Sequence, residues 1–377
     1  MPPLGLYVHV PFCASRCGYC DFNTYTATEL GDSVSRDDFH NVLGNEIRLA
    51  AKSLGSRTVE TVFVGGGTPT LLGASGLVSL LDAVRAEFDL APHAEVTTEA
   101  NPDSVDDGML DALVGGGFTR ISFGMQSTAQ SVLRVLDRTH TPGASLAAAR
   151  SAARAGFEHV NLDLIYGTPG ESDDDLRRSL SDAIEAGVDH ISAYALIVED
   201  GTPLARRVRT GQLPAPDDDV AADRYGIVDS MLSAAGLHWY EVSNWSRPGG
   251  ECQHNLGYWH DDEWWGIGPG AHSHIAGERW WNVKHPRTYA DRLVSDRSPE
   301  EGREVLTENQ RRVERIMLGL RLAEGLSIDA LSDAAAGRAE RQAAVGLLDP
   351  RLLAKGRLVL TTQGRLLADA VIRELVD

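Results

Sequence analysis

The sequence predicts an α/β protein in which parallel strands alternate with helices, followed by a small C-terminal α/β domain. Short β-rich runs alternate with Ala- and Leu-rich segments of helical length up to about residue 200. A strand–turn–helix pattern then occupies residues 356–376. Repeated β-α units favour parallel strands joined by right-handed crossovers. Six such units indicate a barrel or partial barrel, although an open doubly wound sheet has the same pattern.

The individual elements follow from local composition and periodicity. The predicted strands are residues 4–10, 61–64, 95–99, 120–124, 159–165 and 190–196. The predicted helices between them are residues 76–87, 105–114, 144–155 and 173–185. Asp173, Asp174 and Asp175 suit the first turn of the last of these helices, because carboxylates stabilise a helix N-terminus. A helix at 220–235 and a further strand at 238–243 are expected next.

The chain divides into three predicted parts. Residues 1–240 form the barrel, residues 241–300 a connecting segment, and residues 301–377 the C-terminal domain. The connecting segment is rich in Gly and His, and five of the seven tryptophans fall between Trp259 and Trp281. The C-terminal domain begins with an amphipathic helix at 307–323 and is winged-helix-like in outline.

Composition narrows the class of protein. The chain has 377 residues, of which 42% are hydrophobic and 24% charged, ordinary values for a soluble globular protein. A net charge of −19 argues against a nucleic-acid partner, because binding a phosphate backbone needs a basic surface. No run approaches the ~20 apolar residues of a membrane span, and residues 1–10 lack the features of a secretory signal. We therefore expect a cytoplasmic protein without a membrane anchor of its own.

Three of the four cysteines lie within eight residues, in the pattern CxxxCxxC, directly after the first predicted strand. Cys13, Cys17 and Cys20 are too crowded for good disulfide geometry, and a cytosolic chain keeps thiols reduced. Soft thiolates select an iron–sulfur cluster or zinc. A zinc site would need His9 or Cys252 as its fourth ligand. Otherwise Cys252 is expected to be a buried packing thiol.

Polar groups and glycines are expected at the carboxyl ends of the strands. The run Gly65-Gly66-Gly67-Thr68 follows the second strand and would let a ligand approach exposed backbone N–H and C=O groups. It is not a P-loop, because no lysine follows the glycines. The strands that follow carry further polar side chains at their ends, which parallel strands gather on one face. These side chains, together with Arg138, predict a ligand pocket: Glu99, Gln126 and Asp163.

The cysteine spacing, ahead of β-α repeats and beside a glycine loop, resembles the radical S-adenosylmethionine (SAM) superfamily. The resemblance implies a partial (β/α)6 TIM-like barrel, a [4Fe–4S] cluster on Cys13, Cys17 and Cys20, and a reductant for that cluster. One cluster iron stays open and chelates the amino and carboxylate groups of SAM. The resemblance also implies which residues occupy SAM-pocket positions: Tyr7, Tyr19, Gly66, Gly67, Thr68, Glu99, Gln126, Arg138 and Asp163.

Within that superfamily, nearly the whole chain resembles the branch that contains oxygen-independent coproporphyrinogen III oxidases and heme chaperones. The oxidases carry an additional cysteine two residues beyond the third ligand, where this chain has Phe22. Chaperone-type members carry an HNxxYW signature, which is complete here at 254–259. Both features favour a heme chaperone without oxidase activity. The implied heme residues are His254, Asn255, Tyr258 and Trp259, since neutral imidazole ligates heme iron and flat rings pack against the macrocycle.

The residues alone leave open other roles for the tryptophan-rich segment and other functions for the protein. The tryptophan-rich stretch could instead close the bottom or edge of the barrel, with His254 hydrogen-bonded inside. His272 and His274 are competing ligands. Decarboxylation of coproporphyrinogen remains the second hypothesis and RNA modification by a radical SAM enzyme the third. For a chaperone, we expect heme and heme-accepting client proteins as partners, docking through the C-terminal domain, and a monomer or a cluster-dependent dimer. SAM could be regulatory, structural or reactive.

Overall fold

The computed structural model describes residues 2–31 and 34–376. Its centre is a curved sheet of twelve strands. Six neighbouring strands run parallel in sequence order: β1 (Leu4–Val10), β4 (Thr58–Gly66), β5 (Asp89–Ala100), β6 (Arg120–Gln126), β7 (His159–Tyr166) and β8 (His190–Ala195). The predicted α/β class and the alternation of strands with helices are therefore confirmed.

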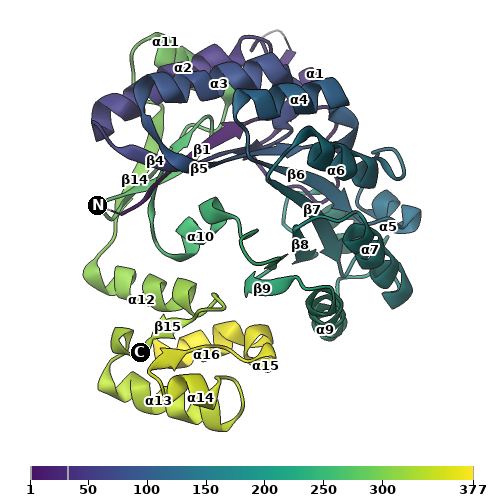
Figure 1. The fold of residues 1–377 in the computed structure, drawn as a ribbon, viewed down its shortest axis with the longest axis vertical. Coiled ribbons are helices and arrows are strands. Elements are labelled where there is room, and N and C mark those ends of the chain that lie inside the picture. Colours follow the sequence, from purple (N-terminus) through teal and green to yellow (C-terminus); the bar gives the residue numbers. More distant parts are fainter. Residues whose placement is uncertain (1, 32–33, 377) are drawn as a thin grey trace.

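The helices that connect the parallel strands cover the convex face of the sheet (Figure 1). They are α2 (Phe39–Leu54), α3 (Gly73–Glu87), α4 (Asp107–Gly116), α6 (Ala144–Ala155) and α7 (Asp173–Glu185), and α9 (Asp218–Ala234) follows the last of the six strands. The three aspartates expected at a helix start do form the first turn of α7, where the hydroxyl of Ser172 accepts from the N–H of Asp175. The outermost strands of the sheet are not neighbours, so the barrel is partial.

Short strands from the tryptophan-rich part of the chain extend the sheet on both sides. On one side β8 is followed by the antiparallel β10 (Asn244–Ser246) and β9 (His238–Glu241). On the other side, β1 pairs in parallel with β11, which continues into an antiparallel edge: β11 (Glu263–Ile267), β12 (His272–Ile275), β13 (Glu278–Asn282) and β14 (Glu300–Val305). β9 confirms the strand expected at 238–243, whereas the other short strands gave too little periodicity to be predicted individually.

Small elements complete the barrel. They are β2 (Phe12–Cys13), β3 (Tyr25–Thr26), α1 (Ala27–Leu30), α5 (Gln130–Val135), α8 (Pro203–Arg209), α10 (Gln253–Trp259) and α11 (Pro286–Val294), with 3-10 turns at Pro69–Leu72 and Pro102–Ser104. Helix α10 lies on the concave side of the sheet, between the sheet and the C-terminal domain (Figure 1). It contains the whole HNxxYW signature, residues 254–259.

The C-terminal region is mostly helical. It contains α12 (Glu308–Gly319), β15 (Leu326–Ser327), a 3-10 turn at Ile328–Ala330, α13 (Asp333–Ala344), α14 (Pro350–Leu353), β16 (Arg357–Leu358), α15 (Thr362–Leu366) and α16 (Ala368–Leu375). The strand expected after Gly356 is only two residues long, because the hydroxyl of Thr361 accepts from Gly364 N–H and starts a helix.

This region has an apolar core of its own, which includes Ile316, Leu320 and Val371. It joins the barrel through polar contacts: Arg365 pairs with Asp229 at 3.1 Å. The predicted division into three domains stays a prediction. In the described part of the chain, no helix combines the length and apolar character needed to cross a membrane.

Candidate functional site

The three clustered cysteines line one cavity of about 400 Å³ at the carboxyl ends of the parallel strands. Cys13 lies in β2, just beyond β1, and all three are half-buried free thiols. The loop is held in place by its backbone, since Gly18 N–H donates to the carbonyl of Leu136 at 3.0 Å. The spacing of the cysteines in the sequence therefore does bring the thiols together around one space.

The three thiols lie in a partly buried loop beside a cationic side chain. Burial raises the pKa of Cys13 and Cys20, and the neighbouring thiols add to the effect. Arg138 donates from Nη1 to Sγ of Cys17 at 3.3 Å and brings positive charge to the loop. In the described ranges, no three His, Cys, Asp or Glu side chains are placed so that they could hold a single metal ion. A cluster asks for a different arrangement, with each cysteine on its own iron.

Neither proposed fourth ligand of a zinc site lines the cavity of the three cysteines. His9 is buried, and its ring nitrogens contact the hydroxyl of Tyr7 at 3.0 Å and the carbonyl of Asn23 at 2.9 Å. Cys252 is far from the loop: its Sγ donates to Glu95, four residues before the end-of-strand residue Glu99 on β5. As expected for a packing thiol, Cys252 is buried.

The glycine loop packs directly against the cysteine loop. Gly66 has a φ of 109°, which favours glycine. A Cβ atom added to Gly67 would lie 2.4 Å from the carbonyl oxygen of Phe12 and 3.1 Å from Sγ of Cys13. These glycines are therefore required for the close approach of two protein segments.

The expectation of free N–H groups in the glycine loop is wrong. Gly66 N–H donates to Oε2 of Glu99 at 3.0 Å. Gly67 and Thr68 donate to carbonyl oxygens just before the cysteine loop, at 2.8 and 2.7 Å. The loop thus holds the cysteine segment and orients Glu99, and these three N–H groups already have acceptors within the protein.

Four acidic side chains line the cavity; Asp103 and Asp137 are exposed, whereas Glu99 and Asp163 are half-buried. Burial raises the pKa of Glu99 to about 8, the charge of Asp163 adds to this, and Gly66 N–H opposes it. Burial also raises the pKa of Asp163, although its carboxylate accepts hydrogen bonds from Ser122 at 2.9 Å and Asn161 at 2.7 Å. A cationic ligand would favour the ionised form of both groups. The ammonium and sulfonium charges of SAM fit this requirement.

Eight of the nine predicted SAM residues line the cavity with the cysteines: Tyr19, Gly66, Gly67, Thr68, Glu99, Gln126, Arg138 and Asp163. Gln126 ends β6 with a φ of 64°, a strained backbone for a non-glycine residue. Tyr7 does not line this cavity; its ring lies on β1 between His9 and His254.

Sequence reasoning missed other residues that line the same cavity, among them Asn101, Ser122 and His140. Burial lowers the pKa of His140 to about 4, and the nearby Arg138 contributes. Ser122 could have been found, because it lies on β6 two residues before Gly124 and bonds the predicted Asp163. His140 lies in a loop, where no periodicity marks its direction.

The predicted heme residues lie on α10, beneath the barrel. His254 is 3% exposed. Its Nδ1 contacts the hydroxyl of Thr61 at 2.7 Å and its Nε2 contacts that of Tyr258 at 2.9 Å. Burial lowers the pKa of His254 to about 4, so the ring is neutral. Both ring nitrogens are engaged, and ligation of iron would require the ring to give up one contact.

Helix α10 separates two cavities. His254 and Tyr258 line a cavity of about 410 Å³, together with Trp264. Asn255 lines a smaller interior cavity of about 110 Å³, which Glu99 and Asp163 also line. One face of α10 therefore reaches toward the floor of the cysteine cavity, and the other faces a separate space. Trp259 lines neither cavity.

The competing histidines lie on β12. His274 is buried, with its ring against Trp264 at 5.1 Å between centroids and its Nδ1 3.5 Å from Oδ1 of Asp261. His272 is exposed and stacks on Trp281 at 5.7 Å. Neither lies on α10 or lines the two cavities beside it.

Comparison with known proteins identifies the family. Residues 7–183 match the model of the radical SAM superfamily. Over 99% of its length the chain is 59% identical to the heme chaperone HemW of Mycobacterium tuberculosis, of which it covers 95%. The chain belongs to the HemW family. HemW of Bacillus subtilis is 35% identical over 85% of this chain and 84% of the relative, and HemW of Escherichia coli 38% identical over 77% and 76%.

The fold agrees with this membership. The structure of coproporphyrinogen III oxidase (HemN) from Escherichia coli superposes with a TM-score of 0.85 at 24% identity, over 99% of this chain and 90% of HemN. At that identity the match shows the fold alone. It confirms the radical SAM barrel with a C-terminal domain, and the HemW family resolves the choice of branch that the signature at 254–259 indicated.

Proposed function

We propose that this protein is a heme chaperone that binds heme and transfers it to acceptor proteins while carrying a SAM-liganded [4Fe–4S] cluster. The observation that carries the proposal is the 59% identity to a heme chaperone over nearly the whole chain. Phe22 supports it, because this side chain is 61% exposed and replaces the additional cysteine of the oxidases.

Cys13, Cys17 and Cys20 would hold the cluster, and the remaining residues of the cavity would hold SAM. When bound, the cluster supplies an open iron for SAM and the electron that can cleave its sulfonium bond. Glu99 and Asp163 offer carboxylates to the positive charges of SAM. Arg138 donates to Sγ of Cys17 at 3.3 Å and to the carbonyl of Gly124 at 2.9 Å.

Heme would bind at α10, with His254 as iron ligand and Asn255, Tyr258 and Trp259 around it. The neutral state of His254 suits coordination, since a protonated imidazole has no free lone pair. Binding would exchange the hydrogen bond to Thr61 or to Tyr258 for an iron bond. We therefore expect heme binding to include a rearrangement of α10.

A heme titration of the anaerobically reconstituted protein tests this function. Stoichiometric binding that weakens in His254→Ala, without turnover of coproporphyrinogen III, supports the chaperone. Absence of heme binding, with SAM cleavage coupled to formation of a vinyl product, would reject the chaperone in favour of the oxidase. His272→Ala is a matched control, since that histidine is on β12 outside the predicted site.

Partners and compartment complete the proposal. A reductant serves the cluster in the cytoplasm, where thiols stay reduced.

Client proteins dock on the C-terminal region, whose separate apolar core supports an independent surface. The test is removal of residues 307–377, which leaves β14 paired with β13 in the sheet. Loss of transfer with retained heme binding is expected, and full transfer would refute client docking there. Sedimentation with and without the cluster distinguishes a monomer from a cluster-dependent dimer.

A further inference from the structure

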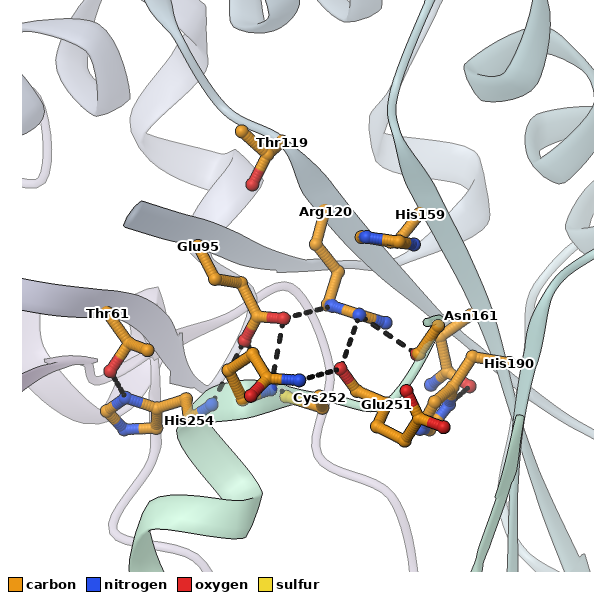
Figure 2. Close-up of polar contacts among 12 residues, drawn as sticks. Thr61, Glu95, Thr119, Arg120, His159, Asn161, His190, Glu251, Cys252 and His254 are labelled. Carbon is orange, nitrogen blue, oxygen red and sulfur yellow. Dashed lines mark hydrogen bonds and ion pairs between the residues drawn. The ribbon is translucent and has the colours of Figure 1, made fainter. Parts of the chain in front are cut away.

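A buried ion pair lies beneath the barrel, at the start of α10. Glu95 on β5 and Arg120 on β6 contact each other through Oε2 and Nε at 2.9 Å, with side chains only 6% and 2% exposed. Figure 2 shows the pair directed toward the chain segment that leads into α10. Neither residue lines the cavity of the cysteines, so the proposed cofactor site does not explain the pair.

Glu95 binds the first residues of the helix. Its Oε1 accepts from Sγ–H of Cys252 at 3.3 Å and from N–H of His254 at 3.1 Å. Its Oε2 accepts from N–H of Gln253 at 3.1 Å. The first N–H groups of a helix have no partner within the helix, so this carboxylate satisfies two of them.

Arg120 binds the chain just before the helix. Its Nη2 donates to the carbonyl oxygens of Gly250 and Glu251, both at 3.0 Å. The planar guanidinium fixes these donors in direction as well as in distance. The ion pair thus forms hydrogen bonds with the backbone on both sides of the helix start, from residue 250 to residue 254 (Figure 2).

These hydrogen bonds determine where the ring of His254 lies. Because the N–H of His254 is bonded to Glu95, the rotation of α10 about its axis is fixed at this residue. That rotation directs the ring toward Thr61, its partner on β4. A buried ion pair contributes little net stability but can impose one arrangement on the chain around it.

We propose that Glu95 and Arg120 are positioning residues for heme: they set the place and rotation of α10 and so present His254 and its signature to the ligand. This inference rests on the proposed function at α10. The pair acts through the backbone of residues 250–254. Neither residue lines the cavity of the cysteines, and Glu95 lines the cavity of His254 and Tyr258.

Hydrogen–deuterium exchange of residues 252–258 tests the positioning directly, without heme. Glu95→Gln removes the charge and one acceptor, and exchange of the Gln253 and His254 amides should accelerate about tenfold. The matched control is Glu171→Gln, which alters another buried pair, Glu171–Arg224 at 3.1 Å. Unchanged exchange in Glu95→Gln would overturn the inference. If Glu95→Gln does not fold, Arg120→Lys replaces it. This variant keeps the positive charge but loses the planar guanidinium with its several donors, and hydrogen exchange of the same amides should accelerate.

Heme titration then tests the consequence. In Glu95→Gln we expect about 10- to 100-fold weaker heme binding and a changed heme spectrum, with iron and sulfide content equal to that of the wild type. If Glu95→Gln has the heme affinity and spectrum of the wild type, the pair are not positioning residues. The chaperone function would still be supported in that case, provided that the wild type binds heme and His254→Ala binds it more weakly. If the wild type itself binds no heme, the proposed function fails, and the amide exchange still decides whether the pair positions α10.

Discussion

Glu95 and Glu99 lie four residues apart on the same strand and have opposite electrostatic surroundings. For Glu95, burial raises the pKa, but Arg120 and the N–H groups of His254 and Gln253 outweigh it, and the pKa is lowered. For Glu99, burial raises the pKa to about 8 and the charge of Asp163 adds to it. One carboxylate is fully compensated by the protein, whereas the other is not.

The difference separates the two ends of the barrel. At the amino-terminal end, the carboxylate of Glu95 accepts hydrogen bonds from Arg120 and from α10, as expected of a structural residue. At the carboxyl end, Glu99 and Asp163 share a cavity with three thiols and lack full compensation. Acidic groups with strongly raised pKa values are typical of ligand sites. The same residue type on one strand thus serves two purposes.

The largest effect should come from Cys13→Ala at the carboxyl end. We expect complete loss of the cluster, because two thiolates cannot replace three, as measured by iron and sulfide analysis after anaerobic reconstitution. Cys252→Ala is the control at the other end and should keep the full cluster content. Full iron–sulfur content in Cys13→Ala would refute the assignment of the ligands.

Alanine substitutions of the two glutamates should differ strongly in stability. Glu95→Ala leaves the Arg120 guanidinium buried and unpaired, so we expect a loss of about 3–5 kcal/mol in the free energy of unfolding in urea. Near pH 4.5 the folded protein keeps Glu99 protonated, and Glu99→Gln keeps an acceptor for Gly66, so at that pH its effect should stay within about 1 kcal/mol. Equal losses in both variants would remove the distinction between the two ends.

The pH dependence sharpens the comparison further. Glu99 has a folded-state pKa of about 8 against an ordinary value of 4.5, so the folded protein binds the additional proton. Its contribution to stability is full below the ordinary value and is lost as the pH rises toward 8, by at most about 1.4 kcal/mol per pH unit. Urea unfolding of the apoprotein between these values should show a steeper decline for the wild type than for Glu99→Gln. Parallel curves would contradict the raised pKa.

The smallest effect should follow from Tyr258→Phe on α10. The substitution removes the hydroxyl that contacts Nε2 of His254 and keeps the ring, so we expect a loss of about 1 kcal/mol in unfolding free energy. It also frees one nitrogen of His254, and heme binding should not weaken by more than about twofold if His254 ligates iron through that nitrogen. Titration with heme measures the second point, and a loss as large as that of His254→Ala would contradict it.

The sequence predicted the parallel strands because buried strands are continuous apolar runs between glycines and helices. It also predicted the cavity, since polar groups at the ends of parallel strands must meet on one face, as Glu99, Gln126 and Asp163 do. The spacing of Cys13, Cys17 and Cys20 was sufficient to predict a shared space.

The parts that the sequence could not predict depend on contacts between distant segments. The partner of His254 is Thr61, almost two hundred residues earlier, and no local pattern marks it. The engagement of the glycine-loop N–H groups by the protein depends on how β1 and β4 pair. The role of Glu95 could not be predicted, because its cationic partner Arg120 lies on the next strand, 25 residues later in the chain.

The position of β1 has a consequence for the order in which the protein matures. β1 lies between β4 and β11, so one side of the strand that leads to the cysteines is completed only by residues 263–267. Asn23, just past the third cysteine, donates to the carbonyls of Pro269 and Lys284. At ordinary ribosomal speeds these residues emerge roughly 10–50 s after the cysteines. Iron and sulfide therefore meet a completed cysteine loop only when most of the chain has been translated.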